Sequence, residues 1–290
     1  MTNHLLAVIG LTVLVHLINT LIYSVRLSGV RTGRLATAYS LFNLIFLIAS
    51  SANMIQAPLL SSLVERAINR GMAALPAHAP VEVLLASPVY QQELASLDQS
   101  IRLVILAATF GTILGGLLIP AFVRVFSQAI LLFEDVGSVP RLILFSLSPR
   151  RLSKALKGLR PAAPETLRQV IRQRAGIPKG FLVLNIIVTG IYTTGVLSAL
   201  YAGALFPHYR ATATLLSGIV NGIAAVLLAT AVDPTAAMIT DQALRGKRDE
   251  RDVRYMSMYL AVTRLLGTLL AQVFFLPAAV LIRTVAALLV

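Results

Sequence analysis

The first apolar segment of the chain carries five polar side chains at helical spacing. Thr12, His16, Asn19, Tyr23 and Arg26 are separated by four, three, four and three residues, so a helix places all five on one face. Five polar groups turned toward lipid would be unfavourable, and we therefore expect this face to meet water or other helices. The stripe predicts either the lining of a polar cavity or hydrogen bonds between helices, which contribute about 0.6 kcal/mol each.

The next apolar segment carries a second polar set, which ends on a proline. Its members follow a compatible period and are Tyr39, Asn43, Ser50 and Asn53, with Gln56 and Pro58 beyond them. Proline removes a backbone donor and crowds the preceding turn, so it loosens the helix at this end. Loosened backbone is tolerated at membrane depth only where protein or a watery cavity satisfies it. This end of the segment therefore also indicates a cavity.

Two arginines, Arg124 and Arg264, fall inside apolar segments. Each lies about six residues from the segment centre toward the predicted cytoplasmic end, or roughly 9 Å from the midplane. A buried arginine costs about 2.5–3.5 kcal/mol, and snorkelling of the side chain to the interface is the purely structural explanation. Every Asp and Glu falls in a loop or at a segment end. Since guanidinium groups match phosphate geometry, the two arginines predict a site for an anion.

The side chains that we expect to contact such an anionic ligand come from four apolar segments. They are Arg264, Arg124, Arg26, His16, Asn19, Tyr23, Asn43, Asn53, Gln56 and Gln272. His16 taken alone is more commonly a hydrogen-bonded core residue than a proton relay. The chain has no GxxxxGK, no HExxH and no clustered His-carboxylate set, and its serines lack His and Asp companions. We therefore expect no catalytic residues, bound metal or cofactor, and a transporter more than an enzyme.

Composition identifies an integral membrane protein. Hydrophobic residues make up 57% of the 290 residues and charged residues 13%, with a mean hydropathy of +0.81, whereas soluble domains average about a quarter charged residues. The net charge of +13 lies beside apolar segments, which favours anionic lipid over nucleic acid as its partner. Cysteine is absent, which excludes disulfides and thiolate metal sites.

The predicted fold class is all-α, a polytopic bundle of six spans that forms one membrane domain over residues 1–290. A span needs about 20 residues, and the runs that suffice are 5–25, 35–55, 101–133, 181–206, 212–232 and 256–282. The third run is over-long, so we expect it to tilt or protrude. Gly111 and Gly115, like Gly218 and Gly222, form GxxxG patterns that predict close helix packing. Pro120 and Pro277 predict kinks.

Basic residues alternate between the loops and predict the topology. Arginines 26, 31 and 34 follow the first span, ten Lys/Arg lie in 134–179, and five lie in 233–254. The segment 56–100 has two and the fourth loop has one. Because basic loops stay cytoplasmic, both termini and 56–100 are predicted to be extracytoplasmic. The N-terminus also lacks the positive start of a cleaved signal peptide, so we expect an uncleaved first span.

Two connecting segments are expected to lie along the membrane surfaces. The external segment 56–100 is predicted to be helical as far as Arg70 and then to cover the outer surface. The cytoplasmic segment 134–180 contains VPRLILFSLSPRRLSKALKGLR, which is typical of an amphipathic helix in an anionic leaflet. Its bases at 150, 151, 154 and 157 are expected to bind anionic lipid, at about 1 kcal/mol each. A second short helix is predicted over 164–174.

Two stretches of the sequence carry a resemblance to a known family. VRLSGVRTGRLATAYSLFN followed by SSANMIQAPLL, and YLAVTRLLGTLLAQVFFLPAA near the C-terminus, resemble the alternate lipid II flippases, the Amj family of bacterial membrane proteins. The resemblance implies a multi-pass protein of the bacterial cytoplasmic membrane that moves lipid II, the undecaprenyl-diphosphate-linked peptidoglycan precursor, between leaflets. It assigns no functional residues, and self-association is left open.

Two other functions fit the residues alone. A membrane enzyme acting on a polyprenyl diphosphate would need acidic Mg²⁺ ligands at a span end, for which Asp233 and Asp241 are the available start. A scaffold that docks partners on its basic inner loop would need none of the polar residues within the spans.

Overall fold

The computed structural model describes residues 3–76, 79–138 and 176–290, and this part of the chain is built from helices without a strand. The elements are α1 (Asn3–Thr32), α2 (Leu35–Ala73), α3 (Val81–Ala86), α4 (Pro88–Val136), α8 (Lys179–Leu205), a 3₁₀ turn (Pro207–Tyr209), α9 (Arg210–Leu227), a π-helical turn (Leu228–Val232), α10 (Asp233–Leu244) and α11 (Glu250–Leu288). The predicted all-α fold class is confirmed.

Six helices of the described residues are long and apolar enough to cross a membrane. They are α1, α2, α4, α8, α11 and the continuous run from Pro207 to Leu244, which joins α9 and α10 through the π-helical turn. The six predicted spans all fall on these helices. Most of these helices extend beyond the predicted spans, whereas α8 ends at Leu205, one residue before its predicted end.

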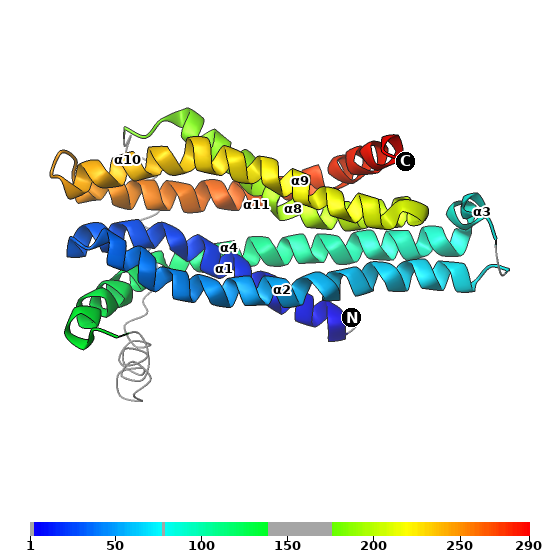
Figure 1. Cartoon of the computed structure of the whole chain (residues 1–290), viewed down its shortest axis with the longest axis horizontal. Helices are drawn as coiled ribbons and strands as arrows, with labels where there is room; N and C mark the ends of the chain where they lie inside the picture. Colours follow the sequence, from blue (N-terminus) through cyan, green and yellow to red (C-terminus); the bar gives the residue numbers. More distant parts are fainter. Residues whose placement is uncertain (1–2, 77–78, 139–175) are drawn as a thin grey trace.

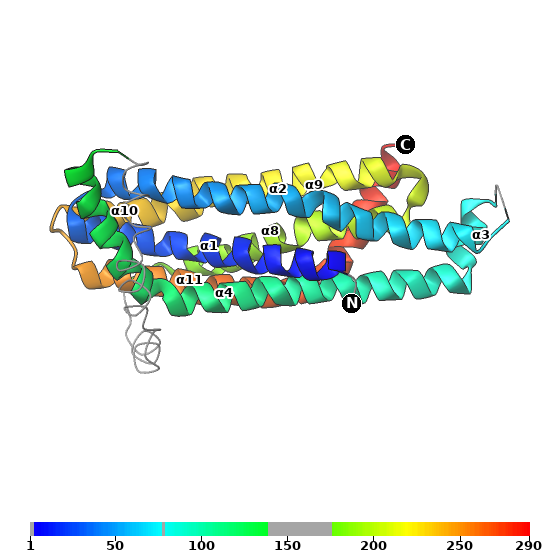
Figure 2. The ribbon, with the colours of Figure 1, turned by 90° about the horizontal axis from the view of Figure 1, so that it is seen from below.

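The six long helices are stacked in pairs. Figure 2 shows α2 and α9 on one side of the bundle, α4 and α11 on the other, and α1 and α8 between them. Figure 1 shows that α1, α2 and α4 form one half of the bundle, while α8, α9 and α11 form the other. Within each half the middle helix packs against both of its companions, α1 against α2 and α4 and α8 against α9 and α11. Any space between the halves is therefore lined chiefly by α1 and α8.

Glycines allow the closest helix contacts in both halves. A Cβ at Gly111 or Gly115 of α4 would collide with the α1 backbone, the latter lying 2.8 Å from the Leu17 carbonyl oxygen. Gly267 of α11 approaches α8 in the same way, since a Cβ there would lie 2.6 Å from the Ile186 carbonyl oxygen. The packing prediction for the GxxxG of α4 is confirmed. It was wrong for Gly218 and Gly222 of α9, where an added Cβ would meet no described atom within 4 Å.

The basic loops of the described chain gather at one end of the bundle. Figure 1 shows the α1–α2 turn, the C-terminal end of α4 and the α10–α11 loop at this end, which we call the basic end, and α3 and both termini toward the opposite end. Arg31 forms an ion pair with Glu250 at 2.7 Å, and Arg34 pairs with Glu134. This arrangement agrees with the charge alternation of the loops. Which side of the membrane each end faces stays a prediction.

The segment 56–100 extends the bundle along its axis and does not lie across it. Pro58 lies inside α2, which continues to Ala73, and α4 already begins at Pro88. The two helices form a hairpin closed by α3 (Figure 1). Its apolar residues pack against each other and against α8, and the hydroxyl of Tyr90 donates a hydrogen bond to the Ala204 carbonyl oxygen at 2.7 Å. The predicted helix as far as Arg70 agrees with α2. The remainder of the segment, which was expected to cover the outer surface, is instead held in the hairpin by this burial.

The last parts of α4 and α11 turn away from the long axis (Figures 1 and 2). Pro120 and Pro277 lie inside these two helices, in agreement with the predicted kinks. The C-terminal end of α4 leads into residues 139–175, which lie outside the described residues. The predicted amphipathic helix with bases 150, 151, 154 and 157, and the predicted helix over 164–174, therefore stay predictions.

Candidate functional site

A cavity of about 560 Å³ lies between the two halves of the bundle. We call it the central cavity. Side chains of α1, α2, α4, α8, α9, α10 and α11 line it, together with the π-helical turn. Seven of the ten residues predicted to bind a ligand line it: Arg264, Arg26, His16, Asn19, Tyr23, Asn53 and Gln56. The polar stripe of α1 thus faces a cavity, because α2 and α4 cover the other faces of α1 and leave this one uncovered.

The same stripe also makes a contact between helices. Gln56 of α2 donates a hydrogen bond from Nε2 to the hydroxyl of Thr12 at 2.6 Å, and Thr12 donates in turn to the carbonyl oxygen of Val8 at 2.7 Å. Both side chains are buried. The two interpretations of the stripe therefore both hold. Thr12 joins α1 to α2 and also lines the cavity, as do the residues further along α1.

Arg264 is the cavity cation without a compensating charge. The structure gives it no ion pair with any described residue, and its buried Nε has no hydrogen-bond partner there. The buried Nδ1 of His16, which also lines the cavity, has no described partner either. A buried charged donor without an acceptor is costly. An anion entering the cavity would supply acceptor oxygens for the guanidinium group.

Arg26 lines the same cavity but has a carboxylate partner. Its Nη2 lies 3.1 Å from Oδ1 of Asp233, and the side chains of the two residues are 14% and 55% exposed. The guanidinium carbon also lies 5.7 Å from the centre of the Tyr39 ring, within the range of a cation–π contact. Arg26 is therefore held in place by an acid from the other half of the bundle.

Three predicted residues do not line the central cavity. Arg124 is exposed, and its Nε donates to the carbonyl oxygen of Pro120 at 3.4 Å; the adjacent Val123 faces the core, which turns Arg124 outward. Asn43 is exposed on α2. Gln272 joins α11 to α4, where its Nε2 donates to the Arg102 carbonyl oxygen at 3.0 Å. The expectation that Arg124 and Arg264 share one cavity is therefore not met in this structure.

The other half of the bundle supplies polar lining residues that were not predicted to bind a ligand. They are Asn185, Thr189, Tyr192 and Thr193 of α8, Asn221 of α9 and Asp233 of α10. Asn185 also ties α8 to α11, because its Nδ2 donates to the Thr263 hydroxyl at 2.8 Å and to the Leu260 carbonyl oxygen at 3.2 Å. The recurrence of polar residues at intervals of four from Asn185 was the signal that could have identified this second stripe.

Helices α2 and α9 both contribute to the lining of the central cavity, which is partly open. Figure 2 shows these two helices on one side of the bundle, with α1 and α8 behind them, and Figure 1 shows them apart. Away from the basic end, an ion pair between Glu65 of α2 and Arg210 at the start of α9 joins the two helices at 3.1 Å. The exposed side chains on the two walls include Met54 and Ile219, which suit contact with lipid.

Comparison with known proteins gives one family and one curated relative. Residues 11–286 match the family described as Amj, alternate to MurJ. The chain is 36% identical over 279 residues to the lipid II flippase Amj of Bacillus subtilis (strain 168), and the match covers 96% of this chain and 95% of the relative. No solved structure matches the chain.

Proposed function

The chain belongs to the Amj (alternate to MurJ) family, and we propose that it is a flippase that moves lipid II across the bacterial cytoplasmic membrane. Lipid II carries the peptidoglycan building block on undecaprenyl diphosphate. The protein is a multi-pass membrane protein, and the precursor passes through it from the inner to the outer leaflet. The expected anionic lipid partners and self-association are further parts of this proposal.

The observation that carries the proposal is the unpaired Arg264 in the central cavity. The diphosphate of lipid II is the anion that this guanidinium group lacks, since phosphate oxygens accept its paired N–H donors side by side. Asn19, Tyr23 and Asn53 line the same cavity and provide hydrogen bonds for the neutral part of the headgroup. The cavity thus offers an unpaired cation for the diphosphate and several polar groups for the neutral part of the headgroup.

The contribution of α2 and α9 to the lining of the central cavity supports transport of a lipid. A glycan and a diphosphate are too polar to cross hydrocarbon unaided, whereas a prenyl tail is stable in it. In this proposal the headgroup lies in the central cavity and the tail passes between α2 and α9 into the bilayer. The exposed apolar side chains of both walls favour that contact.

The other two functions receive less support. The two candidate Mg²⁺ ligands are both ion-paired, Asp233 with Arg26 and Asp241 with Arg245 at 2.9 Å. The family is also one of transporters and not of enzymes. A scaffold that docks partners on its basic loop does not require an uncompensated cation within a span. Its function would persist after charge changes in the spans and would be lost after deletion of the basic loop.

The direct test is transport of labelled lipid II by the purified protein in vesicles. We expect fluorescent lipid II to become accessible to an impermeant quencher on the opposite leaflet, at a rate that rises with the protein-to-lipid ratio. Vesicles with a denatured sample of the same protein are the control. Equal rates with and without folded protein would contradict the proposal, and release of phosphate from the lipid would favour the enzyme instead.

A further inference from the structure

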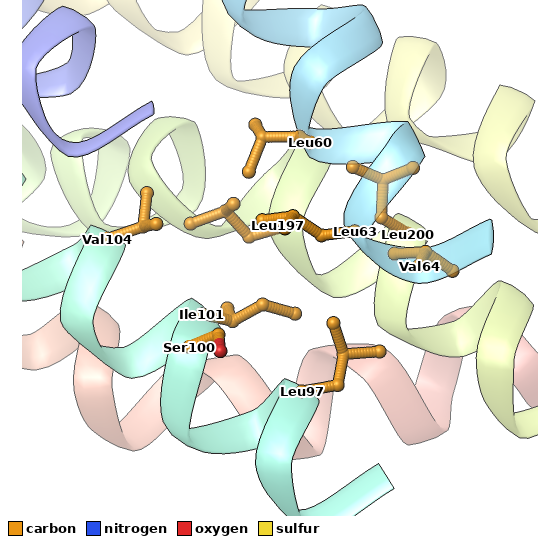
Figure 3. Close-up of a pocket in the computed structure, with 9 residues that line it drawn as sticks. All are labelled: Leu60, Leu63, Val64, Leu97, Ser100, Ile101, Val104, Leu197 and Leu200. Carbon is orange, nitrogen blue, oxygen red and sulfur yellow. The ribbon is translucent and has the colours of Figure 1, made fainter. Parts of the chain in front are cut away.

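A cluster of apolar side chains separates the central cavity from the end of the bundle opposite the basic loops. It comprises Leu60 and Leu63 of α2, Leu97 and Ile101 of α4, and Leu197 and Leu200 of α8, among others (Figure 3). The space among them holds no water-sized volume. We call this cluster the apolar seal. A charged group cannot rest there without losing its hydration.

A second cavity, of about 450 Å³, lies beyond the seal. We call it the outer cavity. The seal borders both cavities, because Leu60, Val104 and Leu197 also line the central cavity, while Leu63, Leu97 and Ser100 also line the outer cavity. The three spaces therefore adjoin one another in one row, in the order central cavity, apolar seal, outer cavity. A group leaving the central cavity in this direction would pass the seal and arrive in the outer cavity.

The outer cavity is lined by two arginines and one carboxylate. Arg66 has no carboxylate partner among the described residues, and its Nη2 instead lies 2.9 Å from Nε2 of His4. Arg70 is 3.5 Å from Glu93, with 62% of its side chain exposed. The two arginines are four residues apart on α2, so both guanidinium groups can reach one ligand. Ser96 and Gln99 of α4 complete a polar lining on the facing wall.

From this row we infer that the outer cavity is a second binding site for the diphosphate group, on the extracytoplasmic side of the apolar seal. The inference rests on the proposed function. Arg264 holds the diphosphate before the seal opens, and Arg66 with Arg70 holds it afterwards. A cationic site on both sides is needed because the seal offers no charged group, and its one hydroxyl, that of Ser100, already donates to the Ser96 carbonyl oxygen. Separation of α2 from α4 and α8 opens the route.

Binding can be tested without transport, because the chain has no cysteine. Gln99 and Gln92 are both exposed glutamines of α4, and only Gln99 lines the outer cavity. We expect inorganic pyrophosphate to slow the labelling of Gln99→Cys by an impermeant maleimide severalfold, to leave Gln92→Cys unaffected, and to lose its effect in the Arg66→Gln, Arg70→Gln background. Undecaprenyl diphosphate in the vesicles should protect at lower concentration than pyrophosphate. The inference would be overturned if pyrophosphate slowed the labelling of neither cysteine or of both equally. Protection by pyrophosphate but not by the lipid would also overturn it.

A transport arm separates this inference from the proposed function. In vesicles, Arg66→Gln, Arg70→Gln should lower lipid II flipping roughly tenfold, the effect of one charge-assisted hydrogen bond. Arg283→Gln removes an exposed cation of α11 that lines none of the three spaces and should flip at the parent rate. If the parent protein moves no lipid II, the proposed function fails. If the parent and the double variant flip equally fast, only the second site fails.

Discussion

Arg26 of α1 and Asp233 of α10 form an ion pair across the central cavity, with 3.1 Å between Nη2 and Oδ1. The two residues are 207 positions apart in the sequence, and Asp233 directly follows the π-helical turn Leu228–Val232. Asp233 thus compensates the charge of Arg26, one of the two arginines that line the cavity. Arg264, the other, has no described counter-ion. The cavity therefore has one cation that is satisfied internally and one that is available to a ligand.

Neutralising Arg264 should strongly reduce transport while leaving the protein folded. We expect Arg264→Gln to lower lipid II flipping roughly tenfold or more, since a charge-assisted hydrogen bond contributes about 1.5–3 kcal/mol. Abundance in the membrane should stay near normal because removal of an intramembrane cation lowers the cost of insertion. Arg264→Lys should restore transport only in part, because an ammonium group cannot form a bidentate contact. Flipping rates in vesicles, scaled to protein content, provide the measurement.

Arg124 is the matched control for that variant. It is also an arginine within a long apolar helix, but it is exposed and lies outside the central cavity. We expect Arg124→Gln to flip lipid II at nearly the parent rate, because snorkelling accounts for this side chain. A loss as large as that of Arg264→Gln would mean that Arg124 joins the site in another conformation, as the spacing in the sequence predicted.

The ion pair predicts opposite effects for its two partners. Asp233→Asn should strengthen binding of the lipid diphosphate, because the carboxylate competes with it for Arg26, whereas Arg26→Gln should weaken binding. Neither change should alter thermal stability much, since a partly exposed ion pair contributes at most about 1 kcal/mol. Titration of the detergent-solubilised variants with undecaprenyl diphosphate measures both affinities. Equal weakening by both substitutions would assign the pair a structural role instead.

Alanine substitutions at two glycines distinguish the effect of helix packing from the effect of helix propensity. A methyl group at Gly115 of α4 would lie 2.7 Å from Cβ of Thr20, whereas one at Gly222 of α9 meets no described atom within 4 Å. We expect Gly115→Ala to destabilise the protein by about 1–3 kcal/mol through overpacking. Gly222→Ala should be neutral or stabilise by up to about 1 kcal/mol. Thermal unfolding in detergent compares the two, and a destabilised Gly222→Ala would point to a partner on α9.

The topology can be checked with single cysteines at the two ends. Gln92 lies on the hairpin side and Lys247 in the α10–α11 loop, and both are exposed. In intact cells we expect an impermeant maleimide to label Gln92→Cys but not Lys247→Cys, because basic loops stay cytoplasmic. Permeabilised cells should show labelling of both. The reverse pattern in intact cells would invert the orientation and with it the direction of transport.

The sequence by itself determined the properties that depend on neighbours along the chain. Hydropathy and run length predicted six long helices, because each helix satisfies its own backbone within the membrane. The period of the polar residues from Thr12 to Arg26 predicted one polar face of α1, which requires only helical geometry. The same local reasoning ended the second span at residue 55 but predicted helix as far as Arg70, and α2 continues to Ala73, where it packs against α4.

Only the tertiary structure decided which faces meet. It placed Arg264 in the central cavity and Arg124 outside it, although both were predicted at one depth. It also brought Asp233 to Arg26 and added the stripe of α8 that begins at Asn185. These outcomes depend on how each helix is rotated about its axis. That rotation is set by contacts between distant segments, such as Gly267 against the backbone of α8, which no local pattern contains.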